Sequence, residues 1–410
     1  MKDETILNLL EKIKQINYSY DKIAQKTGGN FNIFNVLGLE SNEVKHSMLI
    51  GDLLNPKGFH GQGTHFLDLF LDQMNENKTP FELDSTSTVV EVEKNIGLIN
   101  DDKTCGGRLD IYLADKDNNC IIIENKIYAT DQEKQLVRYY NYGESLKNEN
   151  YILIYLNLSG EDPSKYSIQK GNNENDVLVK NKDFTILNYK TFILPWLEKC
   201  LAISNHKPYI REILTQYISI INNLTGQPNN PEMSEDIVTK LTESKENLEA
   251  AFEIQKHLTE AKIEIQWLFW QDLKNAFIKE GFNISDDNSV DKDDVEKYYK
   301  KGEKWYGLSI KNEKLTNKNT YFRVEIEHNI YFGFKTTKNN SSDTITQIKS
   351  IHSDYKNNEH WLGWRRYEPL INFKSFNTNE VLNLVNKNKR ENTIQNILDK
   401  CISDINSFLK

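Results

Sequence analysis

One segment, residues 107–135, constrains the fold more than any other part of the chain. Two short apolar runs, Leu109–Leu113 and Ile121–Glu124, lie on either side of the polar cluster Asp115–Asn119. Apolar runs of this length, separated by residues typical of turns, predict the two strands of a β-hairpin. The pair Gly106-Gly107 precedes the first run and favours a strand that begins just after it.

Neighbouring segments extend the hairpin into a layered domain. Val89–Lys94 alternates apolar and polar residues as a half-buried strand does, whereas Asp131–Leu146 has the periodicity of a helix. Tyr151–Leu158 and Phe184–Leu187 are predicted as further strands. Strands interspersed with helices predict an α/β fold, with a mixed β-sheet flanked by helices.

Helical patterns come before the sheet. Ile6–Ile23 has apolar residues at helical spacing. A second helix is predicted over Glu43–Leu54, with Ser41 as its N-cap, and a third over His65–Met74, with Thr64 as its N-cap. These helices are expected to pack on the mixed sheet.

The second half of the chain predicts a separate domain. We expect an α/β domain over residues 1–226, a linker rich in Pro and Asn over 227–233, and a C-terminal α+β domain over 234–410. The amphipathic stretch Ser234–Gly281 predicts either one long helix or two stacked helices. A polar loop is predicted over Asp286–Lys301, followed by strands and a terminal helix.

Composition limits the classes of function. The net charge of −9 argues against a protein that coats nucleic acid through a global positive field, although it leaves room for a local basic groove. The four cysteines are scattered, with neither the spacing of a zinc finger nor the density of a disulfide scaffold. No apolar run is long enough for a membrane span, and the first residues do not resemble a secretory signal, so a cytoplasmic location is expected.

Three residues of the predicted hairpin point to metal chemistry. Glu124 and Lys126 are two positions apart, so their side chains share one strand face, and the hairpin can bring Asp110 beside them. Two facing carboxylates repel each other unless a cation lies between them, and their oxygens suit Mg²⁺ or Mn²⁺. Such an ion activates water, and an adjacent ammonium group can orient it. The alternative is that Glu124 and Lys126 form an ordinary exposed ion pair on one strand.

The same residues resemble the PD-(D/E)XK nuclease superfamily. Asp110 corresponds to the first acidic residue of its motif, and Glu124-Asn125-Lys126 to its E-x-K triplet. Gln135, in the context QLVRYY, is similar to a glutamine that some branches carry on the following helix. Glu43 is similar to the acidic residue on the first core helix of one bacterial branch. The proline that usually precedes the aspartate is replaced by Leu109, and the resemblance covers about residues 31–226.

This resemblance implies a metal-dependent nuclease of restriction-endonuclease-like fold. Asp110 and Glu124, with Glu43 assisting, would hold Mg²⁺ or Mn²⁺, Lys126 would act on the attacking water, and Gln135 would support the site. It implies a nucleic-acid substrate, with DNA favoured and RNA left open, and a role in bacterial restriction or antiphage defence. A defence-system partner protein and a homodimer are open options. The rival hypothesis is a non-catalytic module that binds nucleic acid or protein while keeping the nuclease fold.

Several residues leave two interpretations open. Glu43 could simply favour the helix dipole, because it lies in a first helical turn. Arg108 and Arg138 could contact phosphate or pair with acids. Three histidines fit no zinc pattern, so structural roles are favoured for His46, His60 and His65. The run WLGWRRY at 361–367 could stack on single-stranded nucleic acid, or it could be a half-buried strand with a basic edge.

Overall fold

The structure is a computed structural model of the 410-residue chain, and it describes residues 2–146, 150–171, 173, 175–284, 289–336, 342–358 and 360–410. It contains two compact units, Ile13–Val238 and the combination of Met1–Lys12 with Thr239–Lys410. Helices α1 (Lys2–Thr27) and α9 (Pro231–Thr242) each cross from one unit to the other. Within the described residues, no helix combines the length and apolar character needed to cross a bilayer. The division into domains at 227–233 stays a prediction.

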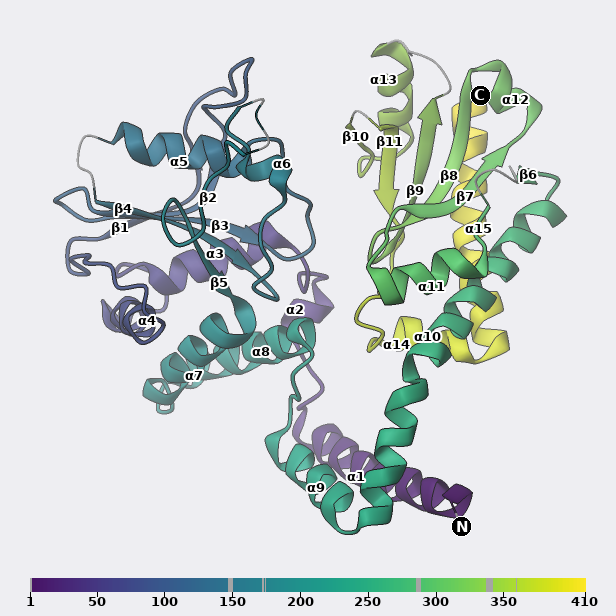
Figure 1. Ribbon diagram of the computed structural model, residues 1–410, viewed down its shortest axis with the longest axis horizontal. Coiled ribbons are helices and arrows are strands. Elements are labelled where there is room, and N and C mark those ends of the chain that lie inside the picture. Colours follow the sequence, from purple (N-terminus) through teal and green to yellow (C-terminus); the bar gives the residue numbers. More distant parts are fainter. Residues whose placement is uncertain are drawn as a thin grey trace. The chain divides into compact units, whose positions relative to one another are not determined.

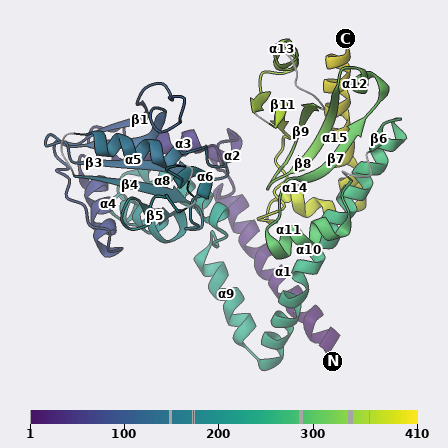
Figure 2. The same ribbon diagram turned by 45° about the horizontal axis from the view of Figure 1, so that its top comes forward.

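A five-stranded sheet organises the Ile13–Val238 unit, and its strands follow the chain order β1-β2-β3-β4-β5 (Figures 1 and 2). The first three strands pair antiparallel, whereas β3, β4 and β5 run parallel. Their bounds are β1 (Val89–Asn95), β2 (Arg108–Ala114), β3 (Cys120–Lys126), β4 (Tyr151–Asn157) and β5 (Thr185–Asn188). The mixed sheet and the hairpin predicted from the sequence are therefore confirmed.

Helices cover both faces of this sheet (Figure 1). Side chains at alternate positions of β3 enter two different cores: Ile121 and Ile123 pack with α3, α4, α7 and α8, whereas Ile122 packs with α5. Burial on both faces explains why β3 is apolar without alternation. The helices and the π-helical turn η1 are α2 (Ile33–Val36), α3 (Glu43–Leu54), α4 (His65–Glu76), α5 (Gln135–Ser145), α6 (Lys165–Ile168), η1 (Tyr189–Ile193), α7 (Leu194–Ile203) and α8 (Pro208–Thr225).

Two helix starts differ from the sequence prediction. The N-cap of α3 is Asn42 rather than Ser41, since the Asn42 side chain accepts a hydrogen bond from the backbone N–H of Lys45. Helix α5 begins at Gln135 rather than at Asp131. The backbone at Lys134 is left-handed, with φ of 52°, and the Asp131 carboxylate is bonded to Tyr155 and Ser164. Those contacts hold residues 131–134 in a loop.

Helix α3 lies close against the sheet at Gly51. A methyl group at this position would collide with the side chain of Val92 on β1 and would lie 3.9 Å from Ile111 on β2. We expect Gly51→Ala to lower the free energy of unfolding by about 1–3 kcal/mol, because overpacking forces the helix away from the sheet. Urea denaturation measures this, and Gly29→Ala is the control, because the backbone at Gly29 is not left-handed and the added methyl group would lie no closer than 3.3 Å to a neighbouring atom.

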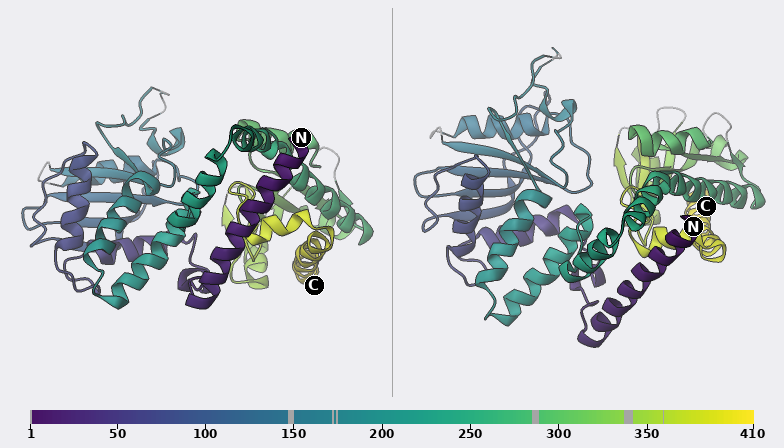
Figure 3. Two further views of the ribbon diagram at one scale, coloured as in Figure 1. Left: turned by 90° about the horizontal axis from the view of Figure 1, so that it is seen from below. Right: turned by 60° about the horizontal axis from the view of Figure 1, so that its bottom comes forward.

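The other unit contains a six-stranded antiparallel sheet in the order β10-β11-β9-β8-β7-β6. Its strands are β6 (Asn283–Ile284), β7 (Tyr306–Lys311), β8 (Thr320–Ile326), β9 (Ile330–Thr336), β10 (Lys356–Asn358) and β11 (Trp361–Arg366). Its remaining elements are α10 (Lys245–Lys279), α11 (Lys292–Lys301), α12 (Glu313–Asn317), α13 (Ser342–Ile351), α14 (Asn379–Leu382), η3 (Asn383–Val385) and α15 (Lys387–Leu409). Figure 3 shows the yellow α15 alongside this sheet. The predicted α+β class is confirmed.

Two predictions for this half can be settled. The stretch Ser234–Gly281 forms two helices, because Ser244 caps α10 by accepting a hydrogen bond from the backbone N–H of Asn247. The loop predicted over Asp286–Lys301 was wrong for most of its length, since α11 occupies Lys292–Lys301; residues 286–288 lie outside the described residues. Helix α11 buries few apolar side chains, and its capping box at Asp291 was the signal that the polar composition concealed.

Candidate active site

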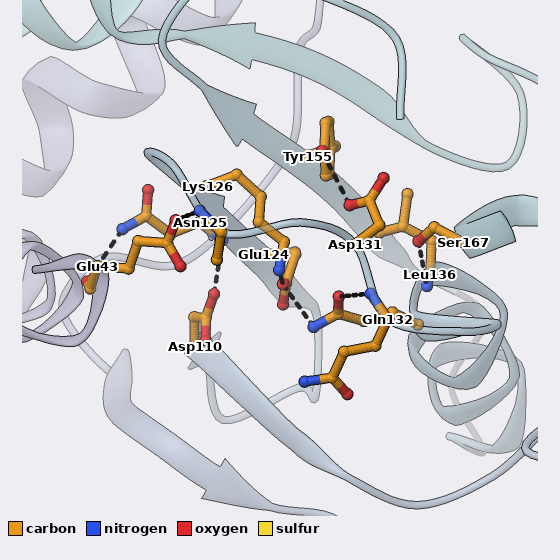
Figure 4. Close-up of polar contacts among 12 residues, drawn as sticks. Glu43, Asp110, Glu124, Asn125, Lys126, Asp131, Gln132, Leu136, Tyr155 and Ser167 are labelled. Atoms are coloured by element: carbon orange, nitrogen blue, oxygen red, sulfur yellow. Dashed lines mark hydrogen bonds and ion pairs between the residues drawn. The ribbon is translucent and has the colours of Figure 1, made fainter. Parts of the chain in front are cut away.

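The predicted catalytic residues meet where β2 and β3 pair (Figure 4). The register sets Ile111 opposite Ile123, so Asp110 and Glu124 follow as the next opposed residues and share a face. The Asp110 carboxylate accepts a hydrogen bond of 2.7 Å from the backbone N–H of Asn125. The sequence prediction that the hairpin brings Asp110 beside the triplet is therefore confirmed as geometry.

Glu124 has two carboxylate oxygens in very different surroundings. Oε1 accepts a hydrogen bond of 2.6 Å from Nε2 of Gln135 and lies 2.8 Å from Nζ of Lys126. Oε2 is buried and has no hydrogen-bond partner among the residues that the structure describes. Glu124 is 1% exposed and Lys126 is 7% exposed, so the alternative of an exposed surface pair is wrong.

Burial makes the negative charges of this cluster costly. The pKa of Asp110 is raised to about 9, first because the carboxyl is desolvated and then because Glu124 lies nearby. Burial also raises the pKa of Glu124, against the opposing effect of Lys126. Burial alone would lower the pKa of Lys126, but Glu124, Glu43 and Asp110 outweigh it and the pKa rises. The two carboxyls thus lie in an environment that a nearby cation would stabilise.

The donor set fits a hard divalent cation. Two carboxylates, one of them with a buried oxygen that lacks a partner, match the ligands of Mg²⁺ or Mn²⁺, which complete their shells with water and substrate oxygens. Across the described ranges, no group of three or more His, Cys, Asp or Glu is arranged to hold a metal ion. Protein ligands would therefore fill only part of the coordination shell, which leaves room for a phosphate.

Glu43 reaches the site from α3 (Figure 4). Its Oε1 accepts hydrogen bonds of 2.7, 2.8 and 2.7 Å from the backbone N–H groups of Ile127, Tyr128 and Ala129. Its charge also acts on Glu124 and Lys126. The carboxylate therefore fixes the turn that follows the triplet, and a favourable position in the helix dipole is only part of its role.

Asn125 is a residue that sequence reasoning passed over. Its side chain points away from Glu124 and Lys126, toward α3 and η1, as alternation requires. Nδ2 donates to the hydroxyl of Ser47 at 3.0 Å, and Oδ1 accepts from the hydroxyl of Tyr189 at 2.8 Å. Asn125 therefore anchors the middle of the triplet to the helical layer while its backbone N–H binds Asp110. The sequence offered one signal for this role: Asn125 is a polar residue whose side chain lies on the opposite strand face from Glu124 and Lys126.

The two arginines singled out from the sequence have partners other than Asp110 and Glu124. Arg108 forms an ion pair of 2.7 Å with Glu93. Arg138 donates to the backbone oxygen of Glu133 and to the side chain of Gln132.

The three histidines also have structural partners. The ring of His46 contacts the hydroxyl of Tyr217 and the backbone oxygen of Glu40. His60 and His65 contact backbone oxygens of their own loop. These bonds agree with the structural roles that the sequence favoured.

Comparison with known families decides the identity of this region. A family model described as the PD-(D/E)XK nuclease superfamily matches residues 31–219. This part of the chain belongs to the PD-(D/E)XK nuclease superfamily. No curated protein and no solved structure matched the chain.

Members of the PD-(D/E)XK superfamily generally hydrolyse phosphodiester bonds with the help of divalent metal ions. The matched range contains all five residues predicted for the site. It also includes both strands of the hairpin, helix α5 and the turn held by Glu43.

Proposed function

We propose that this protein is a Mg²⁺- or Mn²⁺-dependent nuclease that hydrolyses phosphodiester bonds at the Asp110–Glu124–Lys126 cluster. The observation that carries the proposal is the buried Oε2 of Glu124, which lacks a hydrogen-bond partner among the described residues although it lies beside Asp110. With the pKa of Asp110 raised to about 9, the pair holds a proton at neutral pH and becomes fully ionised only when a cation binds. A purely structural role gives no reason to keep it.

Each residue has a separate task in this proposal. Asp110 and Glu124 hold the ion, which when bound polarises a phosphate oxygen and lowers the pKa of a water molecule. Gln135 donates to Glu124 Oε1 and so fixes the carboxylate plane, with Oε2 turned away from that bond. The Nζ of Lys126 contacts the same Oε1 of Glu124 and so places a positive charge beside the carboxylates. There the ammonium group orients the attacking water and stabilises charge on the phosphate.

Glu43 enters the proposal mainly as a positioning residue. Three backbone N–H groups already occupy its Oε1, so the turn after Lys126 depends on it directly. The metal contact predicted for Glu43 from the sequence is not part of this proposal, because no three carboxylates among the described residues are arranged to hold one ion. Glu43 instead holds the chain that follows Lys126.

DNA is the substrate that we favour, and bacterial restriction or antiphage defence is the biological setting. Both rest on the likeness of Glu43, the triplet and Gln135 to one bacterial branch of the superfamily. A homodimer, a defence-system partner and a cytoplasmic location belong to the same proposal. The rival function, a binding module that has lost catalysis, is disfavoured because Asp110, Glu124 and Lys126 are all present.

A cleavage panel tests the proposal. The full-length protein is incubated with supercoiled plasmid, linear duplex, single-stranded DNA and RNA, each with Mg²⁺, Mn²⁺ or EDTA. We expect metal-dependent cleavage of DNA that disappears in Glu124→Gln. Metal-independent binding of these substrates, with no cleavage by either protein, would establish the binding module, and cleavage of RNA alone would overturn the choice of DNA.

Asn125 provides a test of how the site is positioned. We expect Asn125→Leu to lower the free energy of unfolding by about 1–3 kcal/mol, because Ser47 and Tyr189 lose their buried partner. The Mg²⁺ concentration for half-maximal cleavage should rise about tenfold or more, as happens when groups behind metal ligands are removed. Tyr189→Phe, which deletes only one of these bonds, is the matched control and should shift the metal requirement less.

A destabilised Asn125→Leu protein with an unchanged metal requirement would show that Asn125 is structural only. Thermal melts with and without Mn²⁺ separate these roles. The melting temperature without metal reports the loss of packing and hydrogen bonds, whereas the rise that Mn²⁺ causes reports metal binding by the carboxylates.

A further inference from the structure

The sheet of the Thr239–Lys410 unit has two faces of different character. On β8, Phe322, Val324 and Ile326 belong to the hydrophobic core that includes α10 and α15. The alternate residues Tyr321, Arg323 and Glu325 point to the opposite side. We call that side the open sheet face, and the residues that define it are Ser309, Tyr321, Arg323, Glu325, Tyr331, Lys335, Lys356, Trp361, Trp364 and Arg366.

The hydrophobic core of this unit does not reach the open sheet face. The core includes residues from every long strand, but its members do not include Tyr321, Tyr331, Trp361 or Trp364. Among the described residues, the helices that pack on the sheet do so through the other face, where Phe334 contacts Phe408 of α15. Tyr321, Tyr331 and Trp364 are therefore partly exposed on this face, whereas Trp361 is only 6% exposed and packs against Tyr331.

These aromatic rings form a row with cations beside it. Tyr331 lies between Trp361 and Trp364, with ring centroids 5.4 and 5.6 Å apart. The Nζ of Lys335 is 4.3 Å from the ring centre of Trp361, and that of Lys356 is 5.9 Å from the ring centre of Trp364. The three rings pack against one another, and a lysine lies at each end of the row. The row therefore combines aromatic surface with positive charge.

The register of β11 adds one more cation to this face. Arg366 pairs with Tyr331 across the β9–β11 ladder and so lies on the same side. The neighbouring Arg365 points the other way, where its guanidinium binds the Asp404 carboxylate at 2.9 Å, and Tyr367 is a core residue. The side chains of the WLGWRRY run therefore lie on both sides of the sheet. Trp364 and Arg366 lie on the open sheet face, whereas Arg365 and Tyr367 lie on the core side.

Glu325, Tyr331 and Ser309 on the open sheet face bind other residues of the same face. Both oxygens of Glu325 are engaged, one by Tyr331 and the other by Arg323 and Lys335. The hydroxyl of Ser309 accepts from Arg323 at 2.8 Å. What this face presents outward is therefore ring surface and the cations Lys356 and Arg366, on a chain whose overall charge is −9.

We propose that the open sheet face binds single-stranded DNA, with bases stacked on the Trp364–Tyr331 row and phosphates bound by Lys356 and Arg366. A single strand exposes both flat bases and phosphates, whereas a duplex hides its bases, so the face complements the former. Because a single strand of DNA and one of RNA both expose bases and phosphates, the choice of DNA over RNA rests on the proposed nuclease function. The inference deepens the proposed nuclease function by naming a substrate class, yet it concerns binding and not cleavage.

Binding in EDTA tests this inference, because no metal-dependent cleavage can occur. Fluorescence anisotropy of the full-length protein is measured with a labelled 30-nucleotide oligo(dT), a 30-base-pair duplex and oligo(rU). We expect oligo(dT) to bind most tightly. Trp364→Ala should weaken that binding by about tenfold or more, whereas Trp364→Tyr, which keeps a ring, should stay within about threefold.

Charge variants make the test independent of packing. Arg366→Gln should flatten the dependence of log Kd on log salt by about 0.7, the value for one phosphate contact with a single strand. Lys387→Glu is the matched control, since Lys387 is a well-exposed lysine on α15, which packs on the other face. This control should bind oligo(dT) as the wild type does, and circular dichroism melts show whether each variant is folded.

Equal affinity for duplex, tighter binding of oligo(rU), or full oligo(dT) affinity in folded Trp364→Ala would each overturn the inference. The outcomes for the two proposals are distinct. Oligo(dT) binding without any cleavage in the metal panel rejects the nuclease and leaves this surface standing. Cleavage without oligo(dT) binding supports the nuclease and rejects the proposed binding surface.

Discussion

Replacing Asp110 by Asn should reduce metal-dependent DNA cleavage by about a thousandfold or more. The substitution keeps the shape of the side chain and its acceptor for the Asn125 N–H, but it removes one of the two charges that face the ion. Loss of several kcal/mol of charge stabilisation corresponds to about three powers of ten in rate. Initial rates of plasmid nicking over a series of Mn²⁺ concentrations measure the effect.

A second readout shows whether the loss comes from the metal. Mn²⁺ should raise the melting temperature of the wild type, because only the folded protein assembles the carboxylate pair, and it should raise that of Asp110→Asn much less. Glu91→Gln is a control on the neighbouring strand, since Glu91 is exposed and paired with Lys94. Cleavage by Asp110→Asn within about tenfold of the wild type would remove Asp110 from the site.

Much of the site could be predicted because its signals are local. The strands β2 and β3 are short apolar runs on either side of the turn that Asp115 organises by accepting from the backbone N–H groups of Asp117 and Asn119. A short hairpin restricts the register, so the positions of Asp110 and Glu124 relative to each other could be anticipated. The glutamine on the next helix was placed by resemblance, and Gln135 does bond Glu124.

The supporting contacts could not be predicted, because they join distant parts of the chain. Glu43 bonds the turn at residues 127–129, and the hydroxyl of Tyr189 reaches Asn125 from the π-helical turn η1. The residues next to Glu43 and Tyr189 in the sequence give no indication of these partners. The start of α5 was misplaced for the same reason, since the partners of Asp131 are Tyr155 and Ser164.

These distant contacts also explain how a costly cluster is held in place. The turn after Lys126 is fixed by Glu43, the residue before it by Ser47 and Tyr189, and the Glu124 carboxylate by Gln135. Since four residues on three elements, α3, α5 and η1, hold one hairpin end, the two carboxyl groups cannot easily move apart. Preorganisation of this kind favours a bound cation over rearrangement.

Lys126→Met should reduce cleavage by about a hundred- to a thousandfold while metal binding survives. Methionine fills a similar volume but removes the ammonium group that lies 2.8 Å from Glu124 Oε1, and loss of one such group from a catalytic site has effects of this size. Asp110 and the unpartnered Oε2 of Glu124 remain, so the metal ligands of the proposal are intact. Cleavage rates at saturating Mn²⁺ measure the catalytic loss.

The thermal response separates this catalytic role from a structural one. Without its ammonium partner, the buried Glu124 carboxylate loses its compensating charge, so the metal-free variant should melt at a lower temperature than the wild type. Mn²⁺ would replace the missing charge, and its stabilising effect should therefore exceed that in the wild type. Stability restored by Mn²⁺ without restored cleavage would establish that Lys126 acts on the reaction, whereas recovery of both would reduce it to a counter-ion of Glu124.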